Sequence, residues 1–405
     1  MNTARRQKCR TRGSAIALIL LVIILLFIMG LALTDLGLRS RLFALRTATG
    51  IAARCAADAG LTKAMFEMNQ KLEEDSWNDS NLPVATNEAL PGCDSTYSYT
   101  VTPDANNQYL IQSIGSSGIS QKTVNATLTI EGLFEYAIFA DNTIVLKNGT
   151  TIDGYNFDAD DSPLKIGTNS TAAGAITAKV GVTIDGDVAV GTGGVIDVVI
   201  DTRAEAAITG TSYVLTEPRE LPSITVPDAL LAMPSQGTIT TNTTISSSGK
   251  YDSINLGSTG DTITVDGDVT LYVVGNIRIG NSDTFIIADA NTNPDASLTL
   301  YVGGSITTDS GATVNNATMD PTKFITYGLD TCLTIDFKHA GIFYGAIYAP
   351  NAAVHLYNNV EVYGAVVCDS FVQDVDADFH YDASLRDVSI NDPGVKFVTT
   401  RWNEQ

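Results

Sequence analysis

Residues 15–33 form an unbroken apolar run of 19 positions, and this run constrains the chain more than any other feature. A helix of that length measures about 28 Å, enough to cross the hydrocarbon core of a bilayer. Five basic residues and no acid precede the run, which favours a cytoplasmic amino terminus. A cleaved secretory signal has a shorter apolar core and a small-residue exit, whereas this run ends in Thr34-Asp35-Leu36. The sequence therefore predicts a membrane helix.

The helical pattern continues beyond the apolar run. Apolar and small residues recur at alternating intervals of four and three, which places them along one helix face. This seam consists of Leu38, Leu42, Leu45, Thr49, Ala52, Ala56 and Ala59. Alanines with Gly60 nearby allow another element to approach the helix closely. We therefore expect one helix over residues 14–76, with residues 15–33 as its transmembrane part.

The amino-terminal residues resemble a known family. A basic leader ends in Gly13, and Ser14-Ala15-Ile16-Ala17-Leu18 follows, which resembles the class III leader and first helix of type IV pilin-like proteins. The stretch Ala56-Ala57-Asp58-Ala59-Gly60 resembles the Ala-Ala-Glu/Asp-Ala-Gly signature of PilX-type minor pilins. The resemblance implies that residues 1–13 are a prepilin-type leader. It also implies that a prepilin peptidase cuts between Gly13 and Ser14 and methylates the new terminus.

One position departs from the family pattern. Major pilins place Glu at the fifth mature position, where its carboxylate can meet the amino terminus of a neighbouring subunit, and here that position is Leu18. An unpaired charge in hydrocarbon is costly, so the missing carboxylate weakens ordinary stacking below another subunit. Similarity to the minor pilins and pseudopilins that also lack it favours a tip, initiating or low-abundance role.

Residues 93–135 read as a small antiparallel sheet. Three β-rich runs, at 97–101, 108–114 and 122–130, are separated by turn-forming residues. Polar and apolar residues alternate along the third run, which puts one face in a core and the other in water. A helix followed by such a meander is similar to the head of a pilin.

From residue 136 the chain begins to repeat itself. Residues 183–188 return as residues 264–269, and Leu271-Tyr272-Val273 returns as Leu300-Tyr301-Val302. The run Tyr344-Gly345-Ala346-Ile347-Tyr348-Ala349 aligns with Tyr363-Gly364-Ala365-Val366-Val367-Cys368 at an offset of 19. Short strands with Gly, Asn or Asp corners at such spacing suit one rung of a parallel β-helix. We expect an α+β to mainly β chain in which residues 136–390 form a right-handed β-solenoid and residues 391–405 a C-terminal tail. The irregular spacing leaves a β-sandwich open as the alternative.

The carboxy-terminal half carries a second resemblance. The run from Phe343 to Pro350, the run from Val362 to Val367, and Phe379-His380-Tyr381-Asp382 resemble a domain of unknown function found behind PilX-like anchors in bacterial surface proteins. The resemblance supports an anchor followed by a displayed domain and implies no ligand.

Acidic residues dominate the charge. The chain has 24 Lys and Arg against 45 Asp and Glu, a net charge of −21, which argues against nucleic acid as a partner. Asp185 with Asp187 and Asp266 with Asp268 flank glycines, and acidic corners of this kind can bind calcium. Asp-Gly-Asp is also an ordinary tight turn, and the EF-hand loop is absent. We name the four aspartates as calcium candidates and expect no other metal or cofactor.

No motif predicts catalysis. Arg278 and Lys338 are possible bases of a β-helical lyase, yet the sequence does not bring them to the acids, so we expect no enzyme. Cys332 and Cys368 lie in strands roughly two rungs apart and are the pair that a single disulfide would join. Bonding across two rungs requires an irregular register, because stacked strands lie about 4.8 Å apart.

Two functional interpretations follow. In the first, the chain is a minor pilin-like or pseudopilin-like structural protein of a type IV pilus or related filament. Its helix sits in the bacterial inner membrane, its β-domain is periplasmic or extracellular, and its partners are the membrane, other pilin-like subunits, prepilin peptidase and surface polymers. In the second, it is an uncleaved membrane-anchored envelope scaffold or adhesin that acts without pili. Processing after Gly13 separates them.

Overall fold

The structure, a computed structural model, describes residues 14–74, 77–104, 108–157, 162–338, 341–357, 359–390 and 392–404. The leader, with Gly13, lies outside these residues. The chain divides into two compact units. The first contains residues 1–129 and 397–405, and the second contains residues 130–396. The second unit is thus inserted into the sequence of the first.

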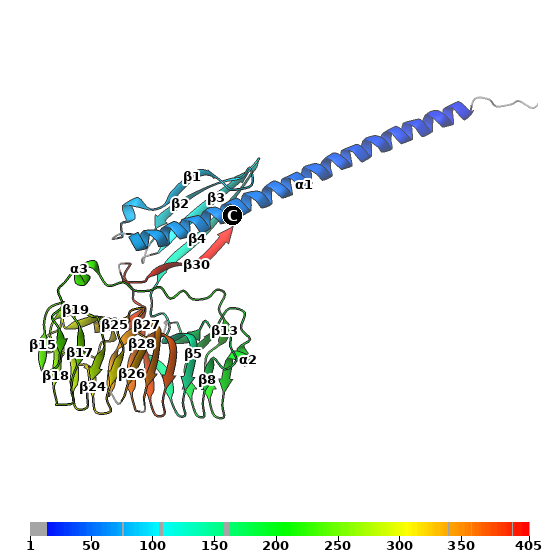
Figure 1. Cartoon of the computed structure of the whole chain (residues 1–405). Coiled ribbons are helices and arrows are strands. Elements are labelled where there is room, and N and C mark those ends of the chain that lie inside the picture. Colours follow the sequence, from blue (N-terminus) through cyan, green and yellow to red (C-terminus); the bar gives the residue numbers. More distant parts are fainter. Residues whose placement is uncertain are drawn as a thin grey trace, which may run out of the picture. The chain divides into compact units, whose positions relative to one another are not determined.

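Helix α1 (Ser14–Glu74) is a single α-helix of 61 residues, as the apolar run and the continuing seam predict. At 1.5 Å per residue it measures about 90 Å. Its second half lies along the sheet of the first unit (Figure 1). Here the buried face differs from the predicted seam by about one residue, because Ala53, Ala57 and Gly60 are buried whereas Ala52 and Ala59 are half-buried.

The first unit contains a five-stranded sheet with the order β1-β2-β3-β4-β30. Its strands are β1 (Val84–Ala89), β2 (Thr96–Pro103), β3 (Tyr109–Ser117), β4 (Ser120–Glu131) and β30 (Lys396–Glu404), and a short 3₁₀ helix, η1 (Asp79–Asn81), precedes β1. The pairs β1–β2, β2–β3 and β3–β4 are antiparallel, which confirms the predicted meander. Strand β1 was not predicted.

Residues 396–404 do not form a tail. They form β30, which pairs with β4. Phe397 is 2% exposed, and its backbone N–H donates to the side-chain oxygen of Asn69 at 2.7 Å. These residues form a strand because Phe397 is buried and because β4 offers an edge for pairing. Neither cause is visible in the local sequence.

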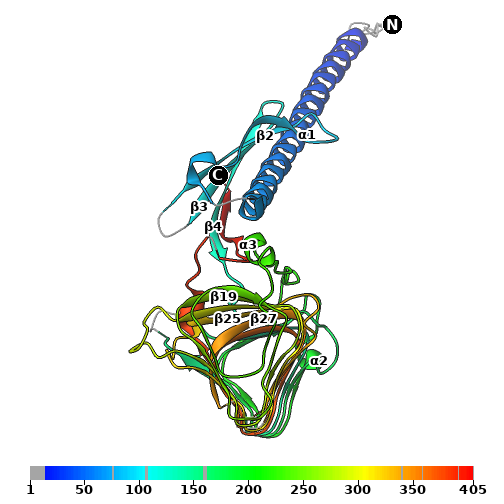
Figure 2. The ribbon, with the colours of Figure 1, turned by 60° about the vertical axis from the view of Figure 1, so that its left-hand side comes forward.

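The second unit is built from parallel strands that wind round three sides, as Figure 2 shows nearly end-on. The first side contains β7 (Lys165–Thr168), β10 (Asp187–Val190), β13 (Ser212–Val214), β16 (Gly249–Tyr251), β19 (Asp268–Val273), β22 (Ser297–Val302) and β25 (Phe324–Gly328). The second side contains β8 (Ile176–Ala178), β11 (Ile200–Thr202), β14 (Thr238–Ile239), β17 (Ser253–Asn255), β20 (Ile277–Ile279), β23 (Ile306–Thr308) and β26 (Thr334–Phe337).

The third side contains β6 (Thr151–Tyr155), β9 (Thr183–Ile184), β12 (Ala207–Ile208), β15 (Thr243–Ile245), β18 (Thr262–Val265), β21 (Thr284–Ile287), β24 (Thr313–Asn316) and β29 (Asp378–Asp382). Strands β5 (Ile138–Leu146), β27 (Ile342–Leu356) and β28 (Glu361–Gln373) bend through more than one side. Among the described residues of this unit, four short helices lie between strands: α2 (Ile196–Val199), α3 (Asp228–Leu231), η2 (Pro321–Lys323) and η3 (Ala383–Arg386). Every pairing between described strands of this unit is parallel, as the repeats predict.

The register places two of the three sequence repeats directly beside one another, whereas the strands of residues 183–188 and 264–269 pair with other strands. Leu271 pairs with Leu300 between β19 and β22, and Tyr344 pairs with Tyr363 between β27 and β28. Alternate residues point inward, so stacked positions such as Ile306 and Ile335 fill the core. Each strand therefore buries its apolar side chains against the strands before and after it.

The order of the strands along the stack differs from their order in the sequence. The last strands pair with the first ones, because Phe371 of β28 lies opposite Ile144 of β5 and Phe379 of β29 opposite Ile152 of β6. The stack thus begins in its middle, continues in one direction to β13, and resumes at its other end after residues 215–237 (Figure 1). Both ends of the inserted chain consequently leave the unit from the middle of the stack.

Candidate membrane and filament interface

The first half of α1 exposes its apolar side chains. Residues 16–48 are exposed along the whole helix circumference, and Phe27, Leu33 and Phe43 each expose about two thirds or more of their surface. By length and composition, α1 is able to cross a membrane. An apolar surface of this extent is unfavourable in water and needs lipid or another protein around it.

The predicted processing and anchoring residues lie at the start of this segment. Ser14 is the first residue of α1, while its predicted partner in processing, Gly13, falls outside the described residues. Leu18 is 66% exposed on the helix surface. The first charged residues after the apolar run are Asp35 and Arg39, which form an exposed ion pair at 2.9 Å. The sequence Ser14 to Thr34 therefore carries no charge.

The second half of α1 packs on the sheet through small residues. Ala53, Ala56, Ala57 and Ala64 are fully buried. A Cβ on Gly115 of β3 would lie 1.9 Å from the carbonyl oxygen of Ala53, which is an impossible contact. The Ala-Ala-Asp-Ala-Gly stretch and Gly115 therefore let helix and sheet backbones approach more closely than larger side chains would allow.

Polar contacts fix the helix on the sheet at the margins of this seam. The hydroxyl of Tyr99 donates to Glu67, and burial together with this hydrogen bond raises the Tyr99 pKa above its usual range. Lys63 pairs with Glu88, which also accepts from the Tyr97 hydroxyl at 2.9 Å. Charged and hydroxyl groups from α1, β1 and β2 thus orient the two layers.

The predicted calcium candidates act at corners of the second unit. Asp185 accepts from the Thr209 hydroxyl at 2.6 Å and Asp187 from the Thr211 backbone N–H at 2.7 Å. At the other pair, Asp266 accepts from Asn293 at 2.9 Å and Asp268 from Ser297 at 2.6 Å. Three of the carboxylates thus bond to neighbouring loop residues, and Asp268 bonds to the first residue of β22. Within the described ranges, no three His, Cys, Asp or Glu side chains gather as a metal site would require.

Sequence reasoning missed a carboxylate, Asp283, that accepts more hydrogen bonds within the protein than any of the four calcium candidates does. Asp283 is fully buried and accepts backbone hydrogen bonds from Ser258, Thr259, Gly260 and Asp261 at 2.7–3.0 Å. Burial alone would raise the pKa of Asp283, but these hydrogen bonds to the ionised form hold the pKa below its usual value. The residues Asn281-Ser282-Asp283 read as an unremarkable turn, so no local signal distinguishes Asp283.

The predicted disulfide is not formed, because Cys332 and Cys368 are both free and buried. Cys368 lies opposite Ala349 of β27, and the Cβ of Ala349 in turn lies against Gly328, beside the sulfur of Cys332. A whole strand thus separates the two thiols, and two strand spacings of about 4.8 Å exceed the reach of a disulfide. The two cysteines are therefore too far apart to bond, as the predicted separation of two rungs implies.

The two predicted candidate bases have structural contacts on the second side of the unit. Arg278 forms an ion pair with Asp309 at 2.5 Å and donates to the backbone carbonyl of Leu256 at 3.3 Å. Lys338 lies over the ring of Tyr357, 5.3 Å from its centroid. The structure thus places Arg278 beside one carboxylate and Lys338 on an aromatic ring.

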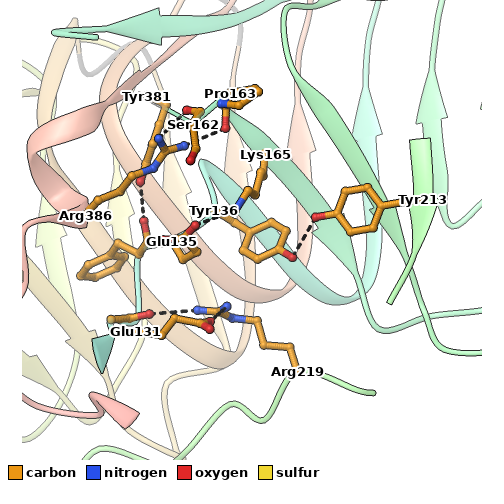
Figure 3. A network of polar contacts seen from close by, with 12 residues as sticks. Glu131, Glu135, Tyr136, Ser162, Pro163, Lys165, Tyr213, Arg219, Tyr381 and Arg386 are labelled. Carbon is orange, nitrogen blue, oxygen red and sulfur yellow. Dashed lines mark hydrogen bonds and ion pairs between the residues drawn. The ribbon is translucent and has the colours of Figure 1, made fainter. Parts of the chain in front are cut away.

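The segment that crosses from β13 to β14 is fixed by a partly buried network (Figure 3). Arg219 pairs with Glu131 and donates to the carbonyl oxygens of Gly132 and Leu133 at 3.0 and 3.2 Å. Its guanidinium also lies 5.0 Å from the ring centroid of Tyr136. The crossing segment is thereby attached to the residues that enter the second unit.

The same network continues toward the end of the inserted chain (Figure 3). Tyr381 of β29 donates to the carbonyl of Phe134 at 2.6 Å, and Arg386 donates to the carbonyls of Ser162 and Pro163. The residues that enter the second unit, at 131–136, are thus bonded both to the crossing segment and to β29 near the end of the unit. The arrangement is structural, and only the position of Arg219 between Pro218 and Pro222 marks it in the sequence.

Comparison with known proteins gives limited matches. Residues 223–388 match the family described as a domain of unknown function, DUF7305. No protein with a curated description matches the chain.

Several solved structures are similar at low identity. The competence-associated pilin ComZ from Thermus thermophilus is 13% identical over 88% of this chain and 97% of that chain, with a TM-score of 0.26. An ice-binding protein from an Antarctic bacterium of the Flavobacteriaceae is 12% identical over 61% of this chain and 96% of its own, with a TM-score of 0.25. One from the Antarctic ascomycete Antarctomyces psychrotrophicus is 14% identical over 60% and 93%, with a TM-score of 0.24.

Proposed function

We propose that this chain is a membrane-anchored, pilin-like structural protein of the bacterial envelope. In this proposal prepilin peptidase removes residues 1–13, and α1 enters or caps a type IV pilus or a related filament. The second unit is a β-solenoid displayed for adhesion or assembly, and the protein performs no catalysis. Calcium at the acidic corners remains a prediction.

The observation that carries the proposal is the division of α1 into two halves. Its first half, residues 16–48, is exposed and largely apolar, and its second half packs through Ala53, Ala56 and Ala57 on an antiparallel sheet. A plain anchor needs only about 20 apolar residues, whereas this helix continues for roughly another 40 as part of a folded unit. Such a helix offers one surface to lipid or neighbouring helices and another to its own head.

The insertion of the second unit fits a displayed role. Both of its ends connect to strands of the first unit, β4 and β30. The first unit then serves as the mount and the second as the presented surface.

Cell fractionation with a leader variant tests the proposal. Gly13→Leu removes the small residue at the predicted cleavage position, and Gly30→Ala within the same helix is the control, because nothing lies within 4 Å of a Cβ at Gly30. We expect the wild type and G30A in sheared filaments and G13L, with its leader, only in membranes. Full-length wild type confined to the membrane, with no effect of G13L, would instead support an uncleaved envelope scaffold or adhesin.

A further inference from the structure

The second side of the second unit has a polar hollow of about 330 Å³. It is formed where β17, β20 and β23 lie side by side and is lined by Ser253, Ile254, Asn255, Asn276, Arg278, Ser305 and Thr307. Burial alternates along these strands, so the isoleucines point inward and the polar residues point outward. The hollow is therefore an open part of one sheet face.

The register arranges the polar groups in two rows. Asn255 lies opposite Arg278, and Arg278 lies opposite Thr307. Ser253 begins β17, whereas Asn276 and Ser305 immediately precede β20 and β23, so all three stand two residues before Asn255, Arg278 and Thr307. Since neighbouring strands lie about 4.8 Å apart, the rows repeat hydrogen-bonding groups at short, regular intervals across the strands.

Several of these groups are available to a ligand. Among the described residues, no hydrogen bond engages the side chains of Asn255 and Thr307. The Oδ1 atom of Asn276 accepts from the backbone N–H of Ser305 at 2.9 Å, which fixes this amide and leaves its NH₂ group for another acceptor. The hollow thus offers preoriented donors and acceptors without breaking a contact of the fold.

Charge narrows the class of ligand. The chain carries a net charge of −21, yet the lining contains no carboxylate, and its one cation, Arg278, is paired with Asp309. An anionic polymer would meet repulsion from the rest of the protein, and a cation would find no acid in the hollow. An apolar ligand would find no exposed apolar side chain, because Ile254, the one apolar residue of the lining, points inward. A neutral ligand rich in hydroxyl groups matches the lining best.

From this we infer that the β17–β20–β23 hollow binds a neutral polysaccharide that lies across the three strands. The inference names the ligand of the displayed unit, and in that sense it rests on the proposed function. Because the lining has no exposed aromatic ring for stacking, a single site binds weakly. Several copies in one filament would raise the apparent affinity by multivalency.

Affinity electrophoresis of the full chain tests this inference. The chain is kept in a polyoxyethylene detergent, which lacks the sugar headgroup that would compete, and runs through native gels containing barley β-glucan, galactomannan or polygalacturonate. The test variant is N255A/T307A, which removes two side chains without internal hydrogen bonds. The matched control is T284A/T313A, a pair of outward threonines that lie opposite each other on β21 and β24.

We expect at least one neutral glycan to retard the wild type and T284A/T313A equally. N255A/T307A should bind at least tenfold more weakly while keeping the wild-type melting temperature. The inference fails if neither neutral glycan retards the wild type, if polygalacturonate retards it as strongly, or if both double variants behave alike. None of these results depends on leader cleavage or filament assembly, so failure here leaves the proposed function standing, and failure of processing leaves the binding result interpretable.

Discussion

Gly115 of β3 lies directly against Ala53 of α1, so closely that a Cβ on Gly115 would stand 1.9 Å from the Ala53 carbonyl oxygen. The contact involves backbone on the helix side and cannot be relieved by turning a side chain. Glycine at this position and the alanines on the facing helix therefore act together. The short distance between helix and sheet depends on the absence of larger side chains on both.

Gly115→Ala should destabilise the first unit by about 2–4 kcal/mol, because the helix must move away from the sheet. Urea unfolding followed by tryptophan fluorescence measures this, since both tryptophans, Trp77 and Trp402, belong to the first unit. Gly50→Ala is the control, because nothing lies within 4 Å of a Cβ there and alanine favours the helix. Equal stability of G115A and G50A would show that the close approach is not as described.

Much of the first unit could be predicted from the sequence. The apolar run and the seam predicted a helix over 14–76, and the structure has it over 14–74. Local alternation located the strands of the meander. The partners of β30 could not be predicted, because it pairs with β4 more than 260 residues earlier and its own sequence, Lys396 to Glu404, has little apolar alternation.

In the second unit, the sequence predicted which strands pair better than it predicted the order of the strands along the stack. Repeats at offsets of 19 and 29 identified strands that pair, such as Tyr344 with Tyr363 and Leu271 with Leu300. Nothing local indicates that β28 returns to β5, because any buried Val or Ile row can stack on another. The corner carboxylates were recognised as turn residues, but the burial of Asp283 depends on a loop more than 20 residues away.

Asp283→Asn should cost about 1–3 kcal/mol at neutral pH, because the amide accepts fewer of the four backbone hydrogen bonds and brings its own donors. The folded-state pKa of Asp283 is lowered, so the carboxylate stabilises the fold above its unfolded pKa of about 4. That contribution is lost as the pH falls from about 4 through the lowered folded pKa.

Thermal unfolding of D283N and wild type from pH 7 to pH 2 checks this. The two melting temperatures should converge below pH 4, whereas the exposed control Asp295→Asn should match wild type throughout. A constant difference between D283N and wild type across this range would contradict the role given to ionised Asp283.

Arg219→Ala should destabilise the second unit by about 3–5 kcal/mol, because it leaves Glu131 and two backbone carbonyls without their donor in a largely buried site. Arg203→Ala is the matched control, since Arg203 forms an exposed ion pair with Asp201 at 2.7 Å and should contribute less than about 1 kcal/mol. Circular dichroism during thermal unfolding measures both. A small effect of R219A would mean that the crossing segment is held by apolar contacts alone.

Cys332 and Cys368 should resist alkylation in the folded protein. Burial raises the pKa of the Cys332 thiol to about 11 and that of Cys368 above its usual value, so little thiolate forms at pH 8. Exposed Cys93 provides the internal control. Iodoacetamide followed by peptide mass spectrometry should label Cys93 first, and all three after denaturation without reductant. A peptide pair joined through Cys332 and Cys368 would contradict the free thiols.

Leader removal would define α1 as a processed, pilin-type helix, as we propose. Its most direct test is mass spectrometry of the amino-terminal peptide, taken separately from sheared surface filaments and from the remaining membranes. We expect a peptide that begins at methylated Ser14 in the filament fraction. An intact leader, with Gly13 still joined to Ser14 and found only in membranes, would contradict it.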